Sequence, residues 1–312
     1  MSETSSRNIG PLFLKIKTSK VYTRIFKAAI PLSCILIAVY AYFTLNLGNW
    51  SSDYDMLYSH PNAVASYLSL TGFEGVTTSH LFVLAARRLA QSWTRNVDQK
   101  SREKYDMVLI IADPYRLLTP ESASLLRSSG WMLIRVEPLY GTPSASNYLN
   151  QNRYTHTAQF TKLWLWTLDG YSHILYLDSD MLIIKNVTSA ISTYKTSSIN
   201  NLGVAGNDEK SMLNAGLLLI NPSIDVFNSM KNALVSIQYD PEYQEQAFLD
   251  AFWKSAPYNI TYMPSELNEG INNLTPNCVV MHFISHNKPW TICNNNDPGK
   301  TSWPCIEWDS YD

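Results

Sequence analysis

The chain has 312 residues, with 24 Lys and Arg against 26 Asp and Glu, and a formal net charge of −2. Six of the basic residues and one of the acids precede residue 28, so the rest of the chain carries 18 basic against 25 acidic residues, a formal charge of −7. Proteins that bind nucleic acid use clustered Lys and Arg to neutralise phosphates, so this balance argues against a nucleic-acid partner.

The first predicted element is a membrane span at residues 28–47, which contain no charged side chain. Twenty residues of helix extend roughly 30 Å, the thickness of a bilayer core. The basic residues before it place residues 1–27 in the cytosol as a short tail. We therefore expect a type II signal anchor, a stalk at 48–62 and a lumenal domain at 63–312. A cleaved signal peptide is the alternative, but its apolar region is usually only about 7–15 residues and ends in a small-x-small site, whereas residues 46–49 are Asn-Leu-Gly-Asn.

The lumenal region alternates between strand-like and helix-like patterns, which is typical of a parallel α/β sheet. Thr119 and Pro120 have the residue types of a helix cap and first helical position, and Gly130 suits the end of that helix. A polar loop at 140–152, rich in Gly, Pro and Ser, is predicted to be a mobile lid. The other predicted elements are strands at 63–70, 107–111 and 131–136, and helices near 77–93, 160–168, 224–236 and 242–254.

A pair of carboxylates closes the apolar run at residues 173–177. Side chains two apart on extended backbone point the same way, so Asp178 and Asp180 can share one ion. Ligands bind at the carboxyl ends of strands in open α/β sheets. Two carboxylates suit Mg²⁺ or Mn²⁺, and an added imidazole favours Mn²⁺. About a hundred residues later, His282 and Lys288 offer that imidazole and a cation for a departing phosphate.

Four segments together resemble glycosyltransferase family 8, the family of glycogenin and the plant galactinol synthases. They are residues 160–164, 176–180, 214–223 and 282–290, and the resemblance extends from about residue 65 to residue 290. It implies a mixed, mostly parallel α/β sheet of GT-A type. It also implies a retaining transferase that takes a nucleotide sugar, usually a UDP-sugar, with Mn²⁺. Retention by an oxocarbenium-like ion pair and by a glycosyl-enzyme intermediate both stay open.

The resemblance also implies a role for each matching residue. The metal ligands would be Asp178, Asp180 and His282, with Lys288 on the diphosphate. Residues near the donor sugar and its anomeric centre would be Lys162, Asn214, Ala215, Gly216, Glu245 and Gln246. Glu245 stands where the family usually has Asp, and Ser285 stands beside the phosphates where many members have Gly. The nucleotide base would lie near Leu70 and Thr71, with Asp113 as a second candidate.

The cysteines and sequons fit a secretory location. An oxidising lumen permits one disulfide, and we favour Cys293 with Cys305 because they flank a loop-rich segment, leaving Cys278 as a buried strand thiol. Sequons begin at Asn186, Asn259 and Asn273. We therefore predict a Golgi membrane enzyme that acts on a glycan, glycoprotein or glycolipid. The alternatives are an inactive lumenal glycan-binding protein and a glycogenin-like primer that glucosylates itself.

Overall fold

The computed structural model describes most of the chain beyond residue 51. The described ranges are residues 52–70, 75–141, 154–195, 197–206, 211–284, 287–293 and 302–311, with backbone alone at 75–79 and 154–157. They belong to one compact unit, Leu47–Asp312. Within these ranges no helix has both the length and the apolar character needed to cross a bilayer. The tail and anchor predicted for residues 1–47 lie outside them.

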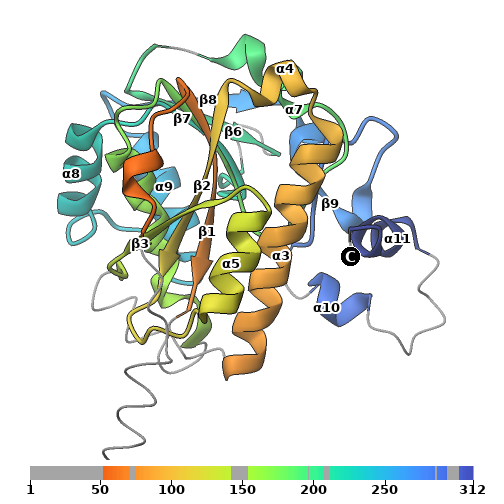
Figure 1. Ribbon diagram of the computed structural model, residues 1–312. Helices are drawn as coiled ribbons and strands as arrows, with labels where there is room; N and C mark the ends of the chain where they lie inside the picture. Colours follow the sequence, from red (N-terminus) through yellow and green to blue (C-terminus); the bar gives the residue numbers. More distant parts are fainter. Residues whose placement is uncertain are drawn as a thin grey trace, which may run out of the picture. The chain divides into compact units, whose positions relative to one another are not determined.

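The centre of the unit is a seven-stranded sheet in the order β3-β2-β1-β4-β7-β6-β8 (Figure 1). Neighbours pair in parallel except where β7 lies between β4 and β6, with antiparallel pairing on both sides. The mixed, mostly parallel α/β sheet expected from the sequence is therefore confirmed. The strands are β1 (Asn62–Ser69), β2 (Tyr105–Ala112), β3 (Met132–Val136), β4 (His173–Leu177), β6 (Asn201–Ala205), β7 (Leu217–Ile220) and β8 (Asn259–Met263).

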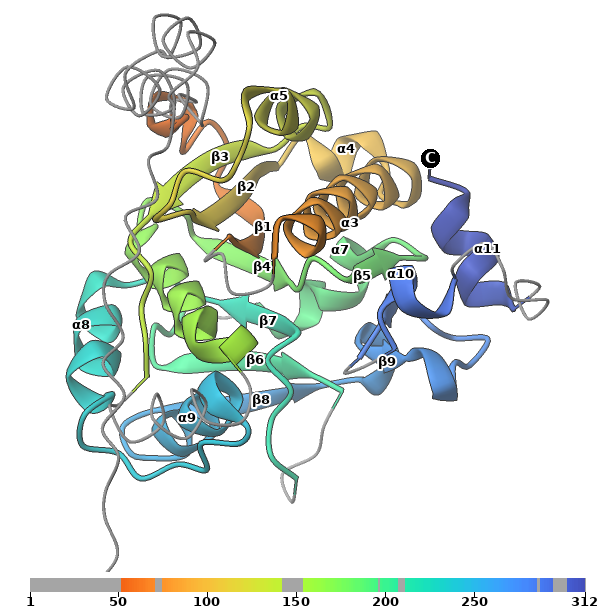
Figure 2. The ribbon, with the colours of Figure 1, turned by 90° about the horizontal axis from the view of Figure 1, so that it is seen from below.

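Helices cover both faces of this sheet (Figure 2). Alternate side chains of β1 enter different cores: Val64 and Leu68 pack with the first helix layer, whereas Ala65 and Tyr67 pack with the second. The first layer contains α3 (Gly75–Asn96), α4 (Gln99–Arg102) and α5 (Pro120–Ser128), and the second contains η3 (Tyr154–Thr167), α8 (Ile224–Ala233) and α9 (Gln244–Trp253). Burial on both faces explains why the strands read as continuous apolar runs rather than alternating ones.

A second sheet of three strands lies beside the first, in the order β5-β10-β9. Strand β10 (Val280–His282) runs antiparallel to β5 (Met181–Ile183) and parallel to β9 (Glu269–Gly270). Its pairing sets His282 opposite Met181. The short elements around the two sheets are η2 (Tyr54–Met56), α7 (Val187–Ile191), η4 (Ser192–Tyr194), η5 (Ser265–Leu267), η6 (Ile271–Asn273), α10 (Pro289–Ile292) and α11 (Trp303–Asp309).

Most predicted boundaries agree with the structure. Thr119 caps α5 by accepting a hydrogen bond from the Ser122 amide at 3.2 Å, and Gly130 has φ +103°, a conformation that glycine adopts without strain. The helix expected near residues 160–168 begins earlier, at Tyr154, and has 3₁₀ geometry. The predicted lid lies almost wholly outside the described residues.

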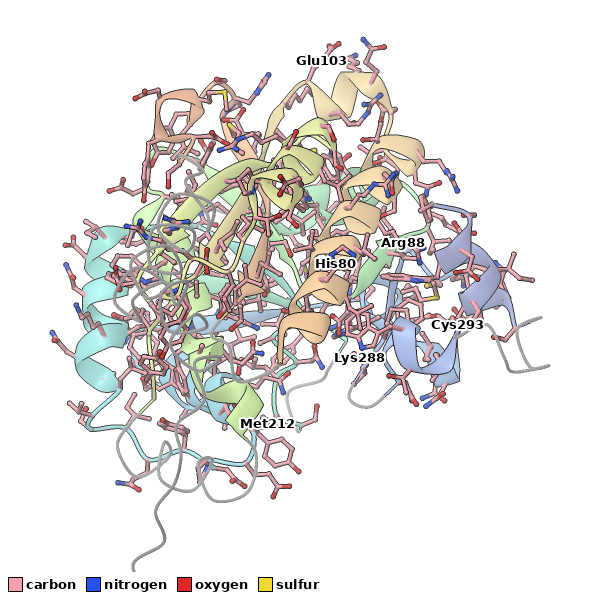
Figure 3. The ribbon with its side chains drawn as sticks, turned by 60° about the horizontal axis from the view of Figure 1, so that its bottom comes forward. His80, Arg88, Glu103, Met212, Lys288 and Cys293 are labelled. Carbon is pink, nitrogen blue, oxygen red and sulfur yellow. A yellow bond between two sulfur atoms is a disulfide. The ribbon has the colours of Figure 1, made fainter. Side chains whose placement is uncertain are left out.

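The disulfide predicted between Cys293 and Cys305 is confirmed. It joins α10 to α11, which packs on α3 through Arg88 over the Trp308 ring at 4.6 Å. Figure 3 shows Lys288 and Cys293 on the segment that carries α10. Cys278 is buried, as expected, but it precedes β10 instead of lying in a strand, and burial raises the pKa of its thiol to about 12.

Replacing both disulfide cysteines with serine is expected to loosen α11. The bond closes a loop of 12 residues, and closure of a loop this short stabilises a protein by about 3 kcal/mol. Hydrogen exchange of the α11 amides should accelerate in the double variant. In the control C278A, which leaves the disulfide intact, exchange in α11 should match the wild type. Equal protection of α11 in the double variant would show that packing on α3 suffices without the bond.

Candidate active site

Two antiparallel pairings bring distant segments to the carboxyl end of β4. Because β7 runs against β4, the loop that precedes β7 meets the loop that follows β4, and the Asp178 amide donates to the Gly216 carbonyl at 2.8 Å. Because β10 runs against β5, His282 reaches the same place, and the Phe283 amide donates to the Asp180 carbonyl at 3.1 Å.

The three residues predicted as metal ligands lie together. His282 Nε2 is 3.4 Å from Asp180 Oδ1 and 3.9 Å from Asp178 Oδ2. One ligand atom from each of the three residues falls within 4.8 Å of the others. Two carboxylate oxygens and one imidazole nitrogen form a donor set that fits a divalent cation. Asp180 and His282 are each 5% exposed, which keeps bulk water away from one side of the set.

Lys288 extends from the start of α10 to the same carboxylates. Its ammonium group contacts Asp180 Oδ2 and donates to the Phe283 carbonyl at 3.1 Å. Burial of Asp180 opposes ionisation, but Lys288 and His282 outweigh that effect and hold the pKa of Asp180 below its ordinary value. Asp180 therefore stays ionised at neutral pH.

Lys162 lies at the centre of a buried ionic cluster and is 1% exposed. Its ammonium donates to Glu245 Oε1 at 2.9 Å and to Asp178 Oδ1 at 3.3 Å. Burial opposes the charged form, yet the two carboxylates hold the pKa of Lys162 above its ordinary value. The Tyr176 hydroxyl also donates to Asp178 Oδ1 at 2.5 Å. The cluster holds Asp178 through Oδ1, whereas His282 faces Oδ2, and it joins Asp178 to the first turn of α9.

The loop that precedes β7 is held by side chains around it. The Gly216 amide donates to Asn214 Oδ1 at 2.8 Å, and the Ala215 amide donates to Gln246 Oε1 at 3.0 Å. Glycine is required at 216 because a Cβ there would lie 2.5 Å from His282 Cε1. Of the three predicted loop residues, Gly216 adjoins the predicted metal ligands directly, Asn214 holds Gly216, and Gln246 supports Ala215.

An open cavity adjoins the two aspartates. Sequence reasoning assigned no role to five of its lining residues, one of which, Ser179, lies between the two predicted aspartates. The sequence could have indicated Tyr67 and Ser69, because they stand at the end of β1, at the same sheet edge as Asp178. It could not have indicated Phe82 and Gln159, because only the packing of their helices brings them to the cavity. The lining residues are Tyr67, Ser69, Phe82, Gln159, Asp178, Ser179, Asp180 and Lys288.

The structure does not test whether the residues predicted near a nucleotide base contact one. Leu70 is 1% exposed, and its amide donates to the Ala112 carbonyl at 2.8 Å. The Asp113 carboxylate accepts from the Leu117 amide at 2.6 Å and faces Arg135 at 3.4 Å, so protein groups already engage it. Thr71 and Ser285 lie outside the described residues. A contact between this region and a base stays a prediction.

Comparisons with known proteins agree on one family. The family model described as glycosyl transferase family 8 matches residues 82–293. A putative UDP-glucuronate:xylan alpha-glucuronosyltransferase 5 of Arabidopsis thaliana is 25% identical over 257 residues, which cover 80% of this chain and 40% of that protein. Glycogenin-1 of Mus musculus is 26% identical over 175 residues, covering 48% of this chain and 51% of that protein. The chain spans only about 31–40% of the first two Arabidopsis relatives.

Solved structures show the same fold. The galactosyltransferase LgtC, in complex with donor and acceptor sugar analogues, has a TM-score of 0.52 at 17% identity and covers 80% of this chain and 94% of its own. The apo form of GlyE from Streptococcus pneumoniae also has a TM-score of 0.52 at 17% identity, over 81% of this chain and 60% of its own. These similarities establish an α/β fold of GT-A type.

Proposed function

The chain belongs to glycosyl transferase family 8 and is a glycosyltransferase, and from this premise we propose that it moves a hexose-type sugar from a UDP-sugar to a hydroxyl acceptor. The observation that carries the proposal is the convergence of Asp178, Asp180 and His282, with ligand atoms within 4.8 Å, at the wall of a cavity that Lys288 also lines. A cation site with an ammonium group nearby suits a diphosphate, whose negative charge both can stabilise.

The residues at the site have two kinds of role: some would bind or stabilise charge, and others hold side chains in position. Asp178, Asp180 and His282 would hold Mn²⁺, which when bound supplies positive charge to the diphosphate. Lys288, about one-quarter exposed, can turn from Asp180 to the departing phosphate and stabilise its negative charge. Lys162 bonds both Glu245 and Asp178, so that the cluster is set before substrate binds.

The transfer itself exchanges one carbon–oxygen bond for another. The bond between the anomeric carbon and the diphosphate oxygen breaks, the acceptor oxygen bonds the anomeric carbon on the same face, the acceptor hydroxyl proton passes to the departing diphosphate oxygen, and UDP leaves. Gln246 and Glu245 extend from the first turn of α9 toward this region. The ion-pair and glycosyl-enzyme routes both fit these positions.

The names of the relatives guide the choice of donor and acceptor. Relatives in Arabidopsis thaliana are named for UDP-glucuronate with xylan and for an inositol phosphorylceramide, and LgtC is a galactosyltransferase. We therefore propose UDP-glucuronate and UDP-galactose as the first donors, with UDP-glucose and UDP-N-acetylglucosamine next. The acceptor is proposed to be a glycan, glycoprotein or glycolipid in the Golgi, with residues 28–47 as the anchor.

The full-length protein tested with each UDP-sugar is expected to release UDP from one donor in the presence of Mn²⁺ and not in the presence of chelator. The mass of the protein should be measured in the same reactions, because sugar added to its own Tyr would identify the self-glucosylating alternative. A folded protein that binds UDP with Mn²⁺ but turns over no donor with any glycan tested would favour the glycan-binding alternative. Turnover that is unaffected by chelator would contradict the metal assignment.

A further inference from the structure

A chain of buried hydrogen bonds joins the loop before β7 to His282 through one side chain, Asn268. Asn268 Nδ2 donates to Asn214 Oδ1 at 3.0 Å and to the Ala205 carbonyl at 3.2 Å. Asn268 Oδ1 faces His282 Nδ1 at 2.9 Å. No motif marked Asn268, which follows the 3₁₀ turn η5 in a polar stretch.

Backbone groups at both ends decide which atom of each amide faces which partner. The Ala205 carbonyl can only accept, so the Asn268 atom that faces it must be the nitrogen. The Gly216 amide can only donate, so the Asn214 atom that faces it must be the oxygen. Asn268 Oδ1 is thereby left facing His282, and the proton must be on His282 Nδ1. The lone pair of neutral His282 is then on Nε2, the nitrogen that faces Asp178 and Asp180.

Packing prevents the Asn268 amide from turning over. Asn268 is 6% exposed and His282 is 5% exposed. Gly206, at φ +93°, lies against Asn268, and a Cβ there would be 3.1 Å from Asn268 Cβ. Gly216 also lies against the imidazole ring, where a Cβ would be 2.5 Å from His282 Cε1. The ring and the amide therefore hold each other in one arrangement.

We propose that Asn268 is a positioning residue that fixes the tautomer and orientation of His282 for the metal and ties the ring to the donor-sugar loop at Asn214. The inference rests on the proposed function, because it assigns Asn268 to the same metal site. Partners of this kind orient metal-binding histidines, and their loss typically lowers metal affinity by about 10–100-fold. Asn268 would thus couple metal binding to the position of the loop that precedes β7.

The variant N268A tests the proposal in the full-length protein, with N62A as its matched control. Asn62 is also a buried asparagine, 9% exposed, and bonds the Lys104 carbonyl and Lys195 from the opposite end of β1. The affinity for Mn²⁺ alone, measured by electron paramagnetic resonance, should fall by about 10–100-fold in N268A and stay unchanged in N62A.

The second measurement needs no substitution at Asn268. Nitrogen-15 labelling of the six histidines, at about pH 8 where an ordinary imidazole is neutral, should show His282 protonated on Nδ1 in the metal-free wild type. The signal is identified by its loss in H282Q. A wild type protonated on Nε2, or a folded N268A that binds Mn²⁺ as tightly as the wild type, overturns the inference alone. A wild type that binds no Mn²⁺ would instead overturn the metal site and this inference with it.

Discussion

Replacing Asp180 with asparagine is expected to lower the rate of sugar transfer by about a thousandfold, since charge stabilisation at a departing group is worth several kcal/mol. Asp180 is buried, faces His282 Nε2 at 3.4 Å and contacts Lys288. Asparagine keeps the shape of the side chain but removes the negative charge that attracts a cation. The measurement is the initial rate of UDP release with the preferred donor at saturating Mn²⁺.

The matched control for D180N is D106N. Asp106 is also a buried aspartate, 5% exposed, and its carboxylate contacts His60 at 2.6 Å and the Tyr171 hydroxyl at 2.8 Å, away from the cavity. D106N is expected to retain transfer near the wild-type rate wherever it remains folded, as judged by circular dichroism. Substantial Mn²⁺-dependent transfer by a folded D180N would refute Asp180 as a metal ligand.

Replacing Lys162 with methionine is expected to lower the free energy of unfolding by about 3–5 kcal/mol, because removing one partner of a buried ion pair leaves an uncompensated charge. The substitution strands Glu245, whose side chain is 9% exposed, and also removes a partner of Asp178. E245Q should lower the free energy of unfolding by less, because Lys162 keeps its contact with Asp178 at 3.3 Å and can still donate to the glutamine oxygen. Urea denaturation of both variants gives the two values.

An exposed pair of the same length provides the comparison. Lys254 contacts Asp250 at 2.9 Å, as Lys162 contacts Glu245, but the Lys254 side chain is 40% exposed. Exposed pairs contribute about 0–1 kcal/mol, so K254M should unfold nearly as the wild type does. If K162M proved as mild as K254M, or if E245Q cost as much as K162M, the cluster would not act as a buried unit centred on Lys162.

The sequence indicated which residues come together where chemistry and local pattern coincide. Asp178 and Asp180 follow an apolar run that could only be a buried strand, and His282 and Lys288 stand in a segment with a recognisable pattern. The geometry brings these four residues together, although their roles in transfer stay predictions. Asp113 shows that a carboxylate at a strand end can also organise its own loop, because it accepts from the Leu117 amide; its contact with a base stays a prediction.

The sequence by itself determined the α/β order of elements, the residues at the end of β4 and the Cys293–Cys305 pairing. Each depends on hydrophobic period, local spacing or the chemistry of a short segment. Only the tertiary structure decided that β7 and β10 run antiparallel to β4 and β5, which brings Asn214 and His282 to the aspartates. Only the tertiary structure shows the proposed role of Asn268, because groups up to 63 residues away along the chain orient its side-chain amide. Strand direction and amide orientation are set by the packing of distant segments, and no local pattern encodes them.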